Sequence, residues 1–160
     1  MELSKRRLPM EQLAQLITLQ LESGGRANLT VTGSSMLPML RNGVDAVELI
    51  QPTGQGQKGD VLLYRRKNGQ YVLHRAIALT DSGYICCGDN QAEREPVDRE
   101  QVLAVVDGFT RGGKRYDLSN GFYRLYTALW VGLFPLRRYY IAVRRPLGRL
   151  RTRLKKKWKK

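Results

Sequence analysis

Acidic residues, histidine and cysteine are scarce in this 160-residue chain, and each scarcity excludes certain kinds of site or of covalent framework. The 14 acidic residues are outnumbered by 28 basic ones, and none of them follows Asp117. The chain has one histidine, His74, and two cysteines, the neighbours Cys86 and Cys87. Neighbouring cysteines rarely pair, because a disulfide between them strains the intervening peptide, so no disulfide framework is expected. Two adjacent thiols and one imidazole also fall short of a tetrahedral zinc site, and we expect neither a metal nor a cofactor.

A secretion signal and a long apolar run are also missing. Polar residues interrupt the stretch that follows the basic segment Met1–Arg7, unlike the apolar region of a signal peptide. The most apolar run, Leu125–Leu136, has twelve residues, whereas a helix that crosses a bilayer needs about 20. The two thiols fit buried, reduced cysteines on a strand. We therefore expect a cytoplasmic protein.

The charge is unevenly distributed and divides the chain into parts. Of the basic residues, 13 follow Leu118, so the first 117 residues carry 15 basic and 14 acidic side chains. A nearly neutral body is thus followed by a polycationic end. The sequence predicts three segments: an N-terminal helix in 1–25, a β domain in 26–117, and a basic, aromatic-rich helical segment in 118–160.

Hydrophobic periodicity predicts a mainly β fold. A helix is expected over 9–22, where apolar residues recur at helical spacing after Pro9 and before Gly24-Gly25. The spacing then changes to alternation, and Asn68-Gly69 is typical of a tight hairpin turn between two strands. Short strands at close intervals predict a small, coiled antiparallel barrel or sheet. The expected strands are Leu29–Thr32, Val44–Ile50, Asp60–Arg66, Gln70–Leu79, Gly83–Cys87 and Gln101–Thr110.

The C-terminal segment 118–160 mixes aromatic and basic residues, which is typical of a helix that lies at a membrane surface. Anionic lipid headgroups attract polybasic segments such as Arg149–Lys160, so peripheral contact with the cytoplasmic face of a membrane is expected. Two alternatives stay open. The segment could be a helix docked on the sheet with a solvated tail, or a tail that binds RNA or DNA without sequence preference. No specific nucleic acid is expected.

The segment from Gly33 to Pro38 is the first candidate site. A β run breaks at Gly33, presents Ser34 and Ser35, and turns at Pro38, which fixes φ and lacks an N–H. A nucleophilic serine needs to be fixed and exposed in this way, although an ordinary serine-rich turn has the same pattern. Ser35 is the candidate nucleophile, and backbone N–H groups near it would stabilise an oxyanion.

His74 is the candidate general base, because its ordinary pKa lies near neutrality and the chain has no other histidine. Its strand face also holds Val72 and Ala76, so a core histidine is the alternative. Asp89, in the turn after a strand, could accept a hydrogen bond from His74 Nδ1 and fix the ring. Glu95 and Asp98 are the other candidates for that role. Ser35 and His74 are 39 positions apart, so only folding can bring them together.

Four motifs occur in the order found in signal-peptidase-like serine peptidases. They are the residues 35–40 (SMLPML), 58–64 (KGDVLLY), 72–75 (VLHR) and 88–90 (GDN). Over about residues 26–110 the chain resembles this superfamily, which includes the self-cleaving SOS and phage repressors. The resemblance implies their β fold and a serine endopeptidase of the variant that uses histidine instead of lysine. It implies Ser35 as nucleophile, His74 as base and Asp89 as the acidic residue, acting on an extended peptide or precursor protein.

The chain departs from the resemblance at one position of the site. Many membrane signal peptidases have a hydroxyl residue two places before the nucleophile, and this chain has Gly33 there. An intracellular peptide precursor is the substrate that fits best. Two other functions stay open: a catalytically silent module that binds peptides, and a regulator of the repressor type. The sequence predicts neither the cleavage motif nor the oligomeric state.

Overall fold

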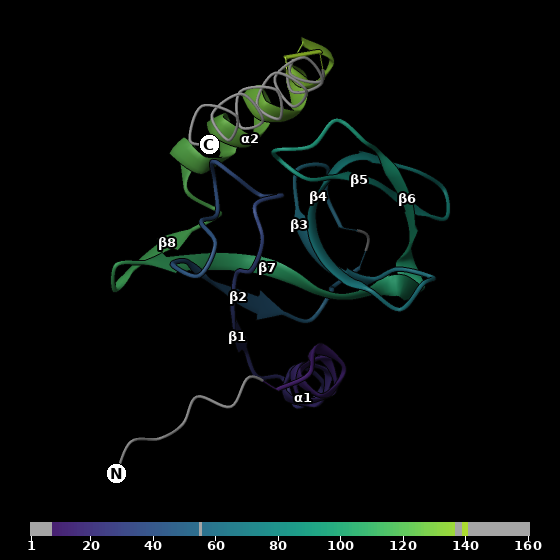
Figure 1. Cartoon of the computed structure of the whole chain (residues 1–160), viewed down its shortest axis with the longest axis vertical. Helices are drawn as coiled ribbons and strands as arrows, with labels where there is room; N and C mark the ends of the chain where they lie inside the picture. The colour runs from purple at the N-terminus through teal and green to yellow at the C-terminus, as the bar shows by residue number, and fades with distance from the viewer. Residues whose placement is uncertain (1–7, 55, 137–138, 141–160) are drawn as a thin grey trace, which may run out of the picture.

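Eight antiparallel strands form one curled sheet in the computed structural model, which describes residues 8–54, 56–136, 139 and 140. The order is β1-β2-β7-β3-β4-β5-β6, and β8 pairs with β7. The sheet curls into half a barrel, with α1 on one side and α2 on the other (Figure 1). The elements are α1 (Met10–Glu22), β1 (Ala27–Thr30), β2 (Ala46–Ile50), β3 (Val61–Arg65), β4 (Tyr71–Leu79), β5 (Gly83–Cys87), β6 (Glu95–Asp98), the short 3-10 helix η1 (Arg99–Gln101), β7 (Val102–Arg111), β8 (Lys114–Asp117) and α2 (Gly121–Gly132). The predicted mainly β, antiparallel fold is confirmed.

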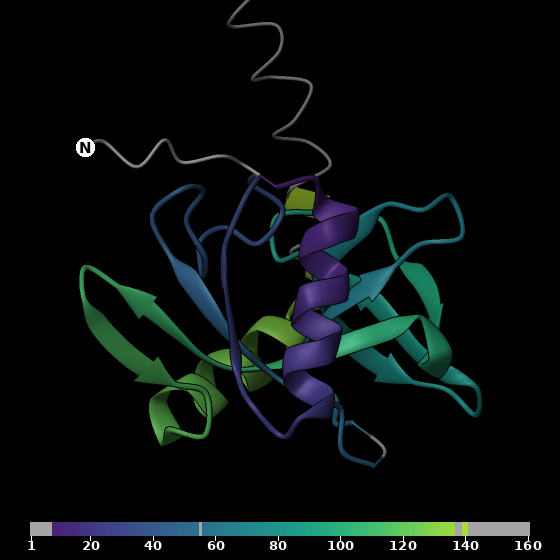
Figure 2. The same cartoon turned by 90° about the horizontal axis from the view of Figure 1, so that it is seen from below.

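Helix α1 lies across the sheet and packs on it through one apolar stripe (Figure 2). Ala14, Ile17 and Leu21 are buried at the spacing of one helix face, whereas Leu19 points to solvent. The helix ends before Gly24, which has a φ of +78° that a residue with a side chain rarely adopts. The helix predicted over 9–22 is therefore confirmed.

The hairpin between β3 and β4 sets the register on which the candidate site depends. Its turn contains Asn68 and Gly69, and Gly69 has a φ of +86°. The pairing places Leu62 opposite His74 and Tyr64 opposite Val72. Because alternate residues share a face, Tyr64 and His74 lie on the same side of the sheet. This hairpin was predicted, and all six predicted strands overlap observed ones.

Two strands, β6 and β8, were not predicted. Strand β6 contains Pro96, which cannot donate to a strand ladder. The proline is tolerated because β6 lies at an edge of the sheet and, among the described strands, pairs only with β5. Strand β8 returns along β7 after a two-residue turn, Gly112-Gly113, in which both residues have positive φ. Proline and paired glycines lower the β propensity of a sequence, so neither strand was predicted. The structure accommodates the proline at an edge strand and the glycines in a turn.

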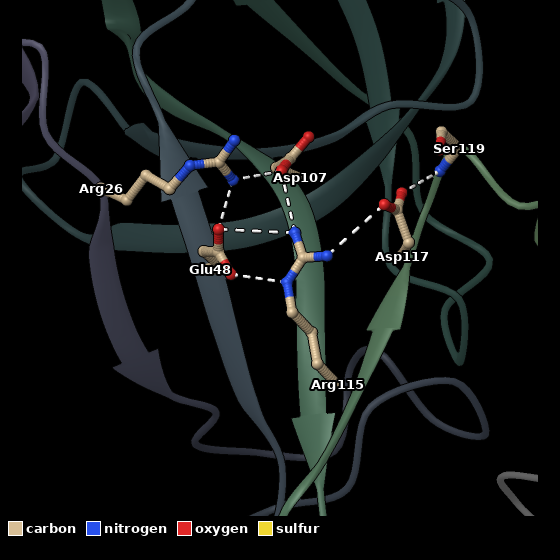
Figure 3. Close-up of polar contacts among 6 residues, drawn as sticks. All are labelled: Arg26, Glu48, Asp107, Arg115, Asp117 and Ser119. Carbon is tan, nitrogen blue, oxygen red and sulfur yellow. Dashed lines mark hydrogen bonds and ion pairs between the residues drawn. The ribbon is translucent and has the colours of Figure 1, made fainter.

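A network of five charged side chains, Arg26, Glu48, Asp107, Arg115 and Asp117, holds β8 against the sheet (Figure 3). Arg115 Nε donates to Glu48 Oε2 at 2.8 Å, and Arg115 Nη2 lies 3.1 Å from Asp107 Oδ2. Arg26, next to β1, contacts the same two carboxylates. The hydrogen bond from Arg115 lowers the pKa of Glu48, against the opposing effect of burial. Single exposed ion pairs stabilise little, but this network joins the start of β1 to β2, β7 and β8.

Buried apolar side chains form separate clusters, and both faces of the central strands are covered. The first cluster lies between the sheet and α1 and includes Met36, Met39 and Leu40 from the loop after β1. The second lies inside the curl of β3 to β6 and includes Leu62, Tyr64, Ala76, Tyr84, Cys86 and Val97. The loop that carries Ser35 is thus anchored in the first cluster, and the face that carries His74 belongs to the second.

Neither cysteine forms a disulfide and both are buried on β5, as the sequence predicts. Cys86 belongs to the second cluster, and burial raises the pKa of its thiol to about 12. A thiol with so high a pKa is almost entirely protonated at neutral pH and is therefore a poor nucleophile.

Helix α2 follows the sheet and begins where Asn120 Oδ1 accepts a hydrogen bond from Phe122 N at 2.9 Å. It covers part of the helical segment predicted over 118–160, of which residues 137, 138 and 141–160 lie outside the described residues. Within the described ranges, no helix has both the length and the apolarity needed to cross a membrane.

The packing of α1 generates a stability prediction. Leu21→Ala should lower the free energy of unfolding by about 2–5 kcal/mol, because Leu21 is almost completely buried against the sheet. Leu19→Ala is the matched control, since Leu19 lies on the same helix but is mostly exposed, and its effect should stay within about 0.5 kcal/mol. Urea denaturation measures both. Equal effects of the two substitutions would contradict the observed face of α1.

Candidate functional site

Ser35 lies in the loop 31–45, between β1 and β2, and the two ends of this loop are joined by backbone hydrogen bonds. Val31 N donates to Asp45 O at 2.9 Å, and Gly43 N donates to Val31 O at 2.8 Å. Between these points the loop is held by the burial of Met36, Met39 and Leu40, whereas Ser35 is half-buried. The position of the Ser35 hydroxyl is therefore determined by core packing as well as by the turn at Pro38.

Asp45 braces the same loop through its buried carboxylate. Arg111 Nη2 lies 2.6 Å from Asp45 Oδ2, and Arg41 Nη2 lies 3.1 Å from Oδ1. Burial on its own raises the pKa of Asp45, but the hydrogen bonds from Arg111 and Arg41 outweigh it and lower the pKa to about 2. Arg111 also donates to Met39 O at 2.6 Å. One guanidinium thus ties the carboxylate to the backbone beyond Ser35.

The turn Gly88-Asp89-Asn90 contacts the serine loop directly, and Asn90 makes the contact. Asn90 N donates to Ser35 O at 2.7 Å, and Asn90 Nδ2 donates to Ser34 O at 3.2 Å. A Cβ on Gly88 would lie 2.8 Å from Ser35 O, which is too close, so this position needs glycine. The motif therefore positions the backbone of the candidate nucleophile.

The prediction that Asp89 accepts a hydrogen bond from His74 is wrong. Asp89 is buried and pairs with the buried Arg75, with Nε to Oδ1 at 2.8 Å and Nη2 to Oδ2 at 2.7 Å. His74 and Arg75 are neighbours on β4, and neighbouring residues of a strand point to opposite faces. Asp89 lies on the face of Arg75, so it is not a ligand of the imidazole.

Glu95, one of the two alternatives, is the carboxylate that contacts His74. Its Oε1 atom lies 2.9 Å from His74 Nδ1. The position follows from the strand register, since Ala76 pairs with Cys86 and Cys86 with Glu95, which brings the carboxylate to the row beside His74. Asp98, the other alternative, is half-exposed at the end of β6 and lies 3.9 Å from Lys67.

Tyr64 and Arg66 complete the surroundings of Glu95, and the sequence analysis named neither. Arg66 Nε donates to Glu95 Oε2 at 2.6 Å, and Arg66 Nη2 donates to Oε1 at 2.8 Å. The Tyr64 hydroxyl donates to Glu95 Oε1 and lies 3.1 Å from His74 Nδ1. The hairpin register, which places Tyr64 on the His74 face, is the signal that could have found the tyrosine.

Electrostatics keep His74 neutral and Glu95 ionised at neutral pH. Burial lowers the pKa of His74, and the nearby Glu95 carboxylate opposes this shift without cancelling it. Burial raises the pKa of Glu95, but hydrogen bonds from Arg66 and Tyr64 outweigh it, and the net shift is downward. An ionised carboxylate accepts the proton on Nδ1, which leaves the lone pair on Nε2. This tautomer is the one that a general base requires.

Ser35 and His74 line the same pocket, which has a volume of about 540 Å³. Its walls also come from the start of α1 and from the hairpin strand β4 and include Met10, Glu11 and Leu73. Folding therefore brings the two predicted residues to one cavity across 39 positions of sequence. No hydrogen bond joins Ser35 to His74 among the described residues. Such bonds are often long without substrate and shorten when it binds.

The backbone N–H of Ser35 is a candidate oxyanion donor. Gly33 N is already engaged, because it donates to Asn42 Oδ1 at 3.0 Å, and Pro38 has no N–H. Ser35 N donates to no acceptor in the described part of the chain. Ser34 is exposed beside Gly33. Of the predicted loop residues, Gly33 thus uses its N–H within the loop, so this N–H is not available to an oxyanion.

The single histidine makes the electrostatic description directly testable by NMR. The pKa of His74 should lie below its ordinary 6.5 because the ring is buried. Glu95→Gln should lower it further, since the carboxylate that stabilises the imidazolium is lost, while Asp98→Asn on the same strand should leave it unchanged. Titration of the imidazole carbon-bound protons measures all three proteins. A pKa above 6.5, or one that does not respond to Glu95→Gln, would contradict the assignment.

Comparisons of this chain with models of protein families, with curated proteins and with solved structures found no match. The function is therefore argued from the residues of the pocket.

Proposed function

We propose that the protein is a serine endopeptidase in which Ser35 is the nucleophile, His74 the general base and Glu95 the residue that orients the imidazole. The observation that carries this proposal is the shared pocket of Ser35 and His74, together with the 2.9 Å contact between His74 Nδ1 and Glu95. A serine and an imidazole that line one pocket, with a carboxylate bound to the imidazole, can activate a hydroxyl for attack on a carbonyl.

In the first step, His74 Nε2 takes the proton from Ser35 Oγ while Oγ attacks the peptide carbonyl carbon. The imidazolium formed is stabilised by the Glu95 carboxylate, and the oxyanion by the Ser35 N–H. His74 then gives the proton to the leaving amine as the C–N bond breaks, and an acyl ester on Ser35 remains. Water, deprotonated by His74, hydrolyses this ester. General-base catalysis of this kind contributes about 10²- to 10⁴-fold, and a well-placed oxyanion donor about as much.

An extended peptide is the substrate that the surroundings of the pocket favour. Strand β1 pairs only with β2, so its other edge is open among the described strands. The chain continues from β1 into Val31 and Thr32, both of which line the pocket. A peptide that adds to such an edge supplies its own backbone hydrogen bonds and passes next to Ser35. Cleavage within a precursor, as the sequence resemblance implies, fits this geometry.

A fluorophosphonate probe, which reacts with activated serines, tests the nucleophile. Wild-type protein should be labelled, and Ser35→Ala should lose the label because the attacking oxygen is removed. Ser34→Ala is the matched control, since it removes the neighbouring hydroxyl and should be labelled like the wild type. Intact-protein mass spectrometry measures the adduct. Both variants should keep their unfolding free energy within about 0.5 kcal/mol, as neither side chain is in the core. Labelling that survives in Ser35→Ala would refute the assignment.

The buried carboxylate of Asp89 and the half-buried one of Glu95 give a second test because they predict opposite phenotypes. Glu95→Gln should slow labelling by about 10²- to 10⁴-fold, since the imidazole loses its orientation and its countercharge. Asp89→Asn should instead destabilise the fold by about 3–5 kcal/mol, because it leaves Arg75 buried without a countercharge. Labelling rates and thermal unfolding distinguish the two effects. If Asp89→Asn were stable but slow, and Glu95→Gln fully active, the roles would have to be exchanged.

A peptide-binding module without catalysis is the second candidate. It is favoured by one observation, that no hydrogen bond joins Ser35 to His74 within the described residues. Wild-type protein that binds peptides but resists the probe at every pH would support this function. The regulator of the repressor type stays a prediction of the sequence resemblance.

A further inference from the structure

The strongest feature that the candidate site does not use is an apolar stripe along α2 and the turn that follows it. We call this the α2 stripe: Phe122, Leu125, Leu129, Leu133 and Leu136. These residues recur every three or four positions, so along α2 they lie on one face. Each is between 51% and 81% exposed. Isolated apolar residues on a surface are ordinary, but a continuous row of five marks a surface that binds something.

The opposite face of α2 is attached to the body, so the helix cannot rotate to bury the stripe. Val131 and Phe134 pack into a cluster with Ile77 and Cys87. The Tyr123 hydroxyl accepts a hydrogen bond from the buried Arg75 Nη1 at 2.9 Å. Rotation would break this bond and expose the cluster, and the stripe is therefore a permanent feature of the surface.

We propose that the α2 stripe binds the surface of an anionic lipid bilayer. All 13 charged residues after Leu118 are basic, and ten of them follow Tyr140. Apolar residues continue in the sequence among these charges, at Val143, Leu147, Leu150, Leu154 and Trp158. An exposed aliphatic helix face followed in the sequence by aromatic residues and positive charge matches the interface of a bilayer with acidic headgroups.

Charge argues against the other occupants of the stripe. A second copy would bring another polycationic segment close to the first, and the two would repel each other. Nucleic acid would be attracted by the charge, but it does not need a row of leucines. Of these three occupants, an anionic bilayer is the one that uses both properties. The proposal is independent of catalysis, since the pocket that Ser35 lines contains none of the five residues of the α2 stripe.

Vesicle co-sedimentation of the full chain tests the proposal. The wild type should bind vesicles of phosphatidylcholine with about one quarter phosphatidylserine, and bind pure phosphatidylcholine at least tenfold more weakly. The double variant Leu125→Gln with Leu129→Gln removes apolar surface without changing charge and should bind the anionic vesicles at least tenfold more weakly. The matched control is Leu16→Gln with Leu19→Gln, which changes two exposed leucines of α1 and should bind like the wild type.

Several outcomes would overturn the proposal. The stripe is not a lipid-binding surface if the wild type does not bind the anionic vesicles, or if the two double variants bind them equally. A dimer that dissociates in the α2 variant, seen by analytical ultracentrifugation without vesicles, would make the stripe a contact between copies. Tighter binding to single-stranded RNA that ignores the α2 variant would assign the charges to nucleic acid. Ser35→Ala should bind vesicles normally, so failure of the peptidase proposal would be recognised separately.

Discussion

Strand β4 is buried on both faces, and the rest of the structure is arranged around the two charged or polar side chains that this strand carries into the interior. His74 enters one face and Arg75 the other. Each needs a carboxylate there, because an unpaired polar group in an apolar interior costs free energy of the order of kcal/mol. Glu95 serves the histidine and Asp89 the arginine. The two pairs lie on opposite faces of the sheet, although His74 and Arg75 are adjacent residues.

Arg75 joins parts of the chain that are distant in sequence. Its guanidinium contacts Asp89, the Gly59 carbonyl and the Tyr123 hydroxyl of α2. The turn of Asp89 in turn places Asn90 on the Ser35 carbonyl. A buried ion pair adds little net stability compared with apolar packing, but it is demanding about geometry. This pair therefore fixes the relative positions of β4, the serine loop and α2. The position of Ser35 depends on the same pair through the contact of Asn90.

Local patterns were sufficient for most of the fold. Helical spacing located α1, and alternation with the Asn68-Gly69 turn located the β3–β4 hairpin. The edge strand β6 escaped because Pro96 weakens its β character. The identity of the carboxylate beside His74 could not be decided from sequence for a related reason. It depends on how β6 pairs with β5, and that pairing joins residues whose distance in the sequence carries no information about register.

The roles of Asp89 and Glu95 could not be separated from the alternation on β4 alone. The pairing of the strands was needed as well. Alternation predicts that His74 and Arg75 point to opposite faces of the sheet, but it does not predict which carboxylate lies on each face. Asp89 was the first candidate because it directly follows a strand and belongs to the motif at residues 88–90, whereas Glu95 follows a polar loop. The motif turned out to serve the backbone of Ser35 and the charge of Arg75.

The pairing of Glu95 with Arg66 suits the imidazole to its proposed role. A lone carboxylate near a buried histidine would raise its pKa strongly and favour imidazolium, which cannot accept a proton. Arg66 offsets part of the Glu95 charge and itself lowers the pKa of His74, while burial acts in the same direction. The Glu95 carboxylate thus accepts a hydrogen bond from Nδ1–H, but it does not raise the pKa of His74 enough for Nε2 to be protonated as well at neutral pH. A base that stays neutral until the serine delivers its proton is the state that attack on a carbonyl requires.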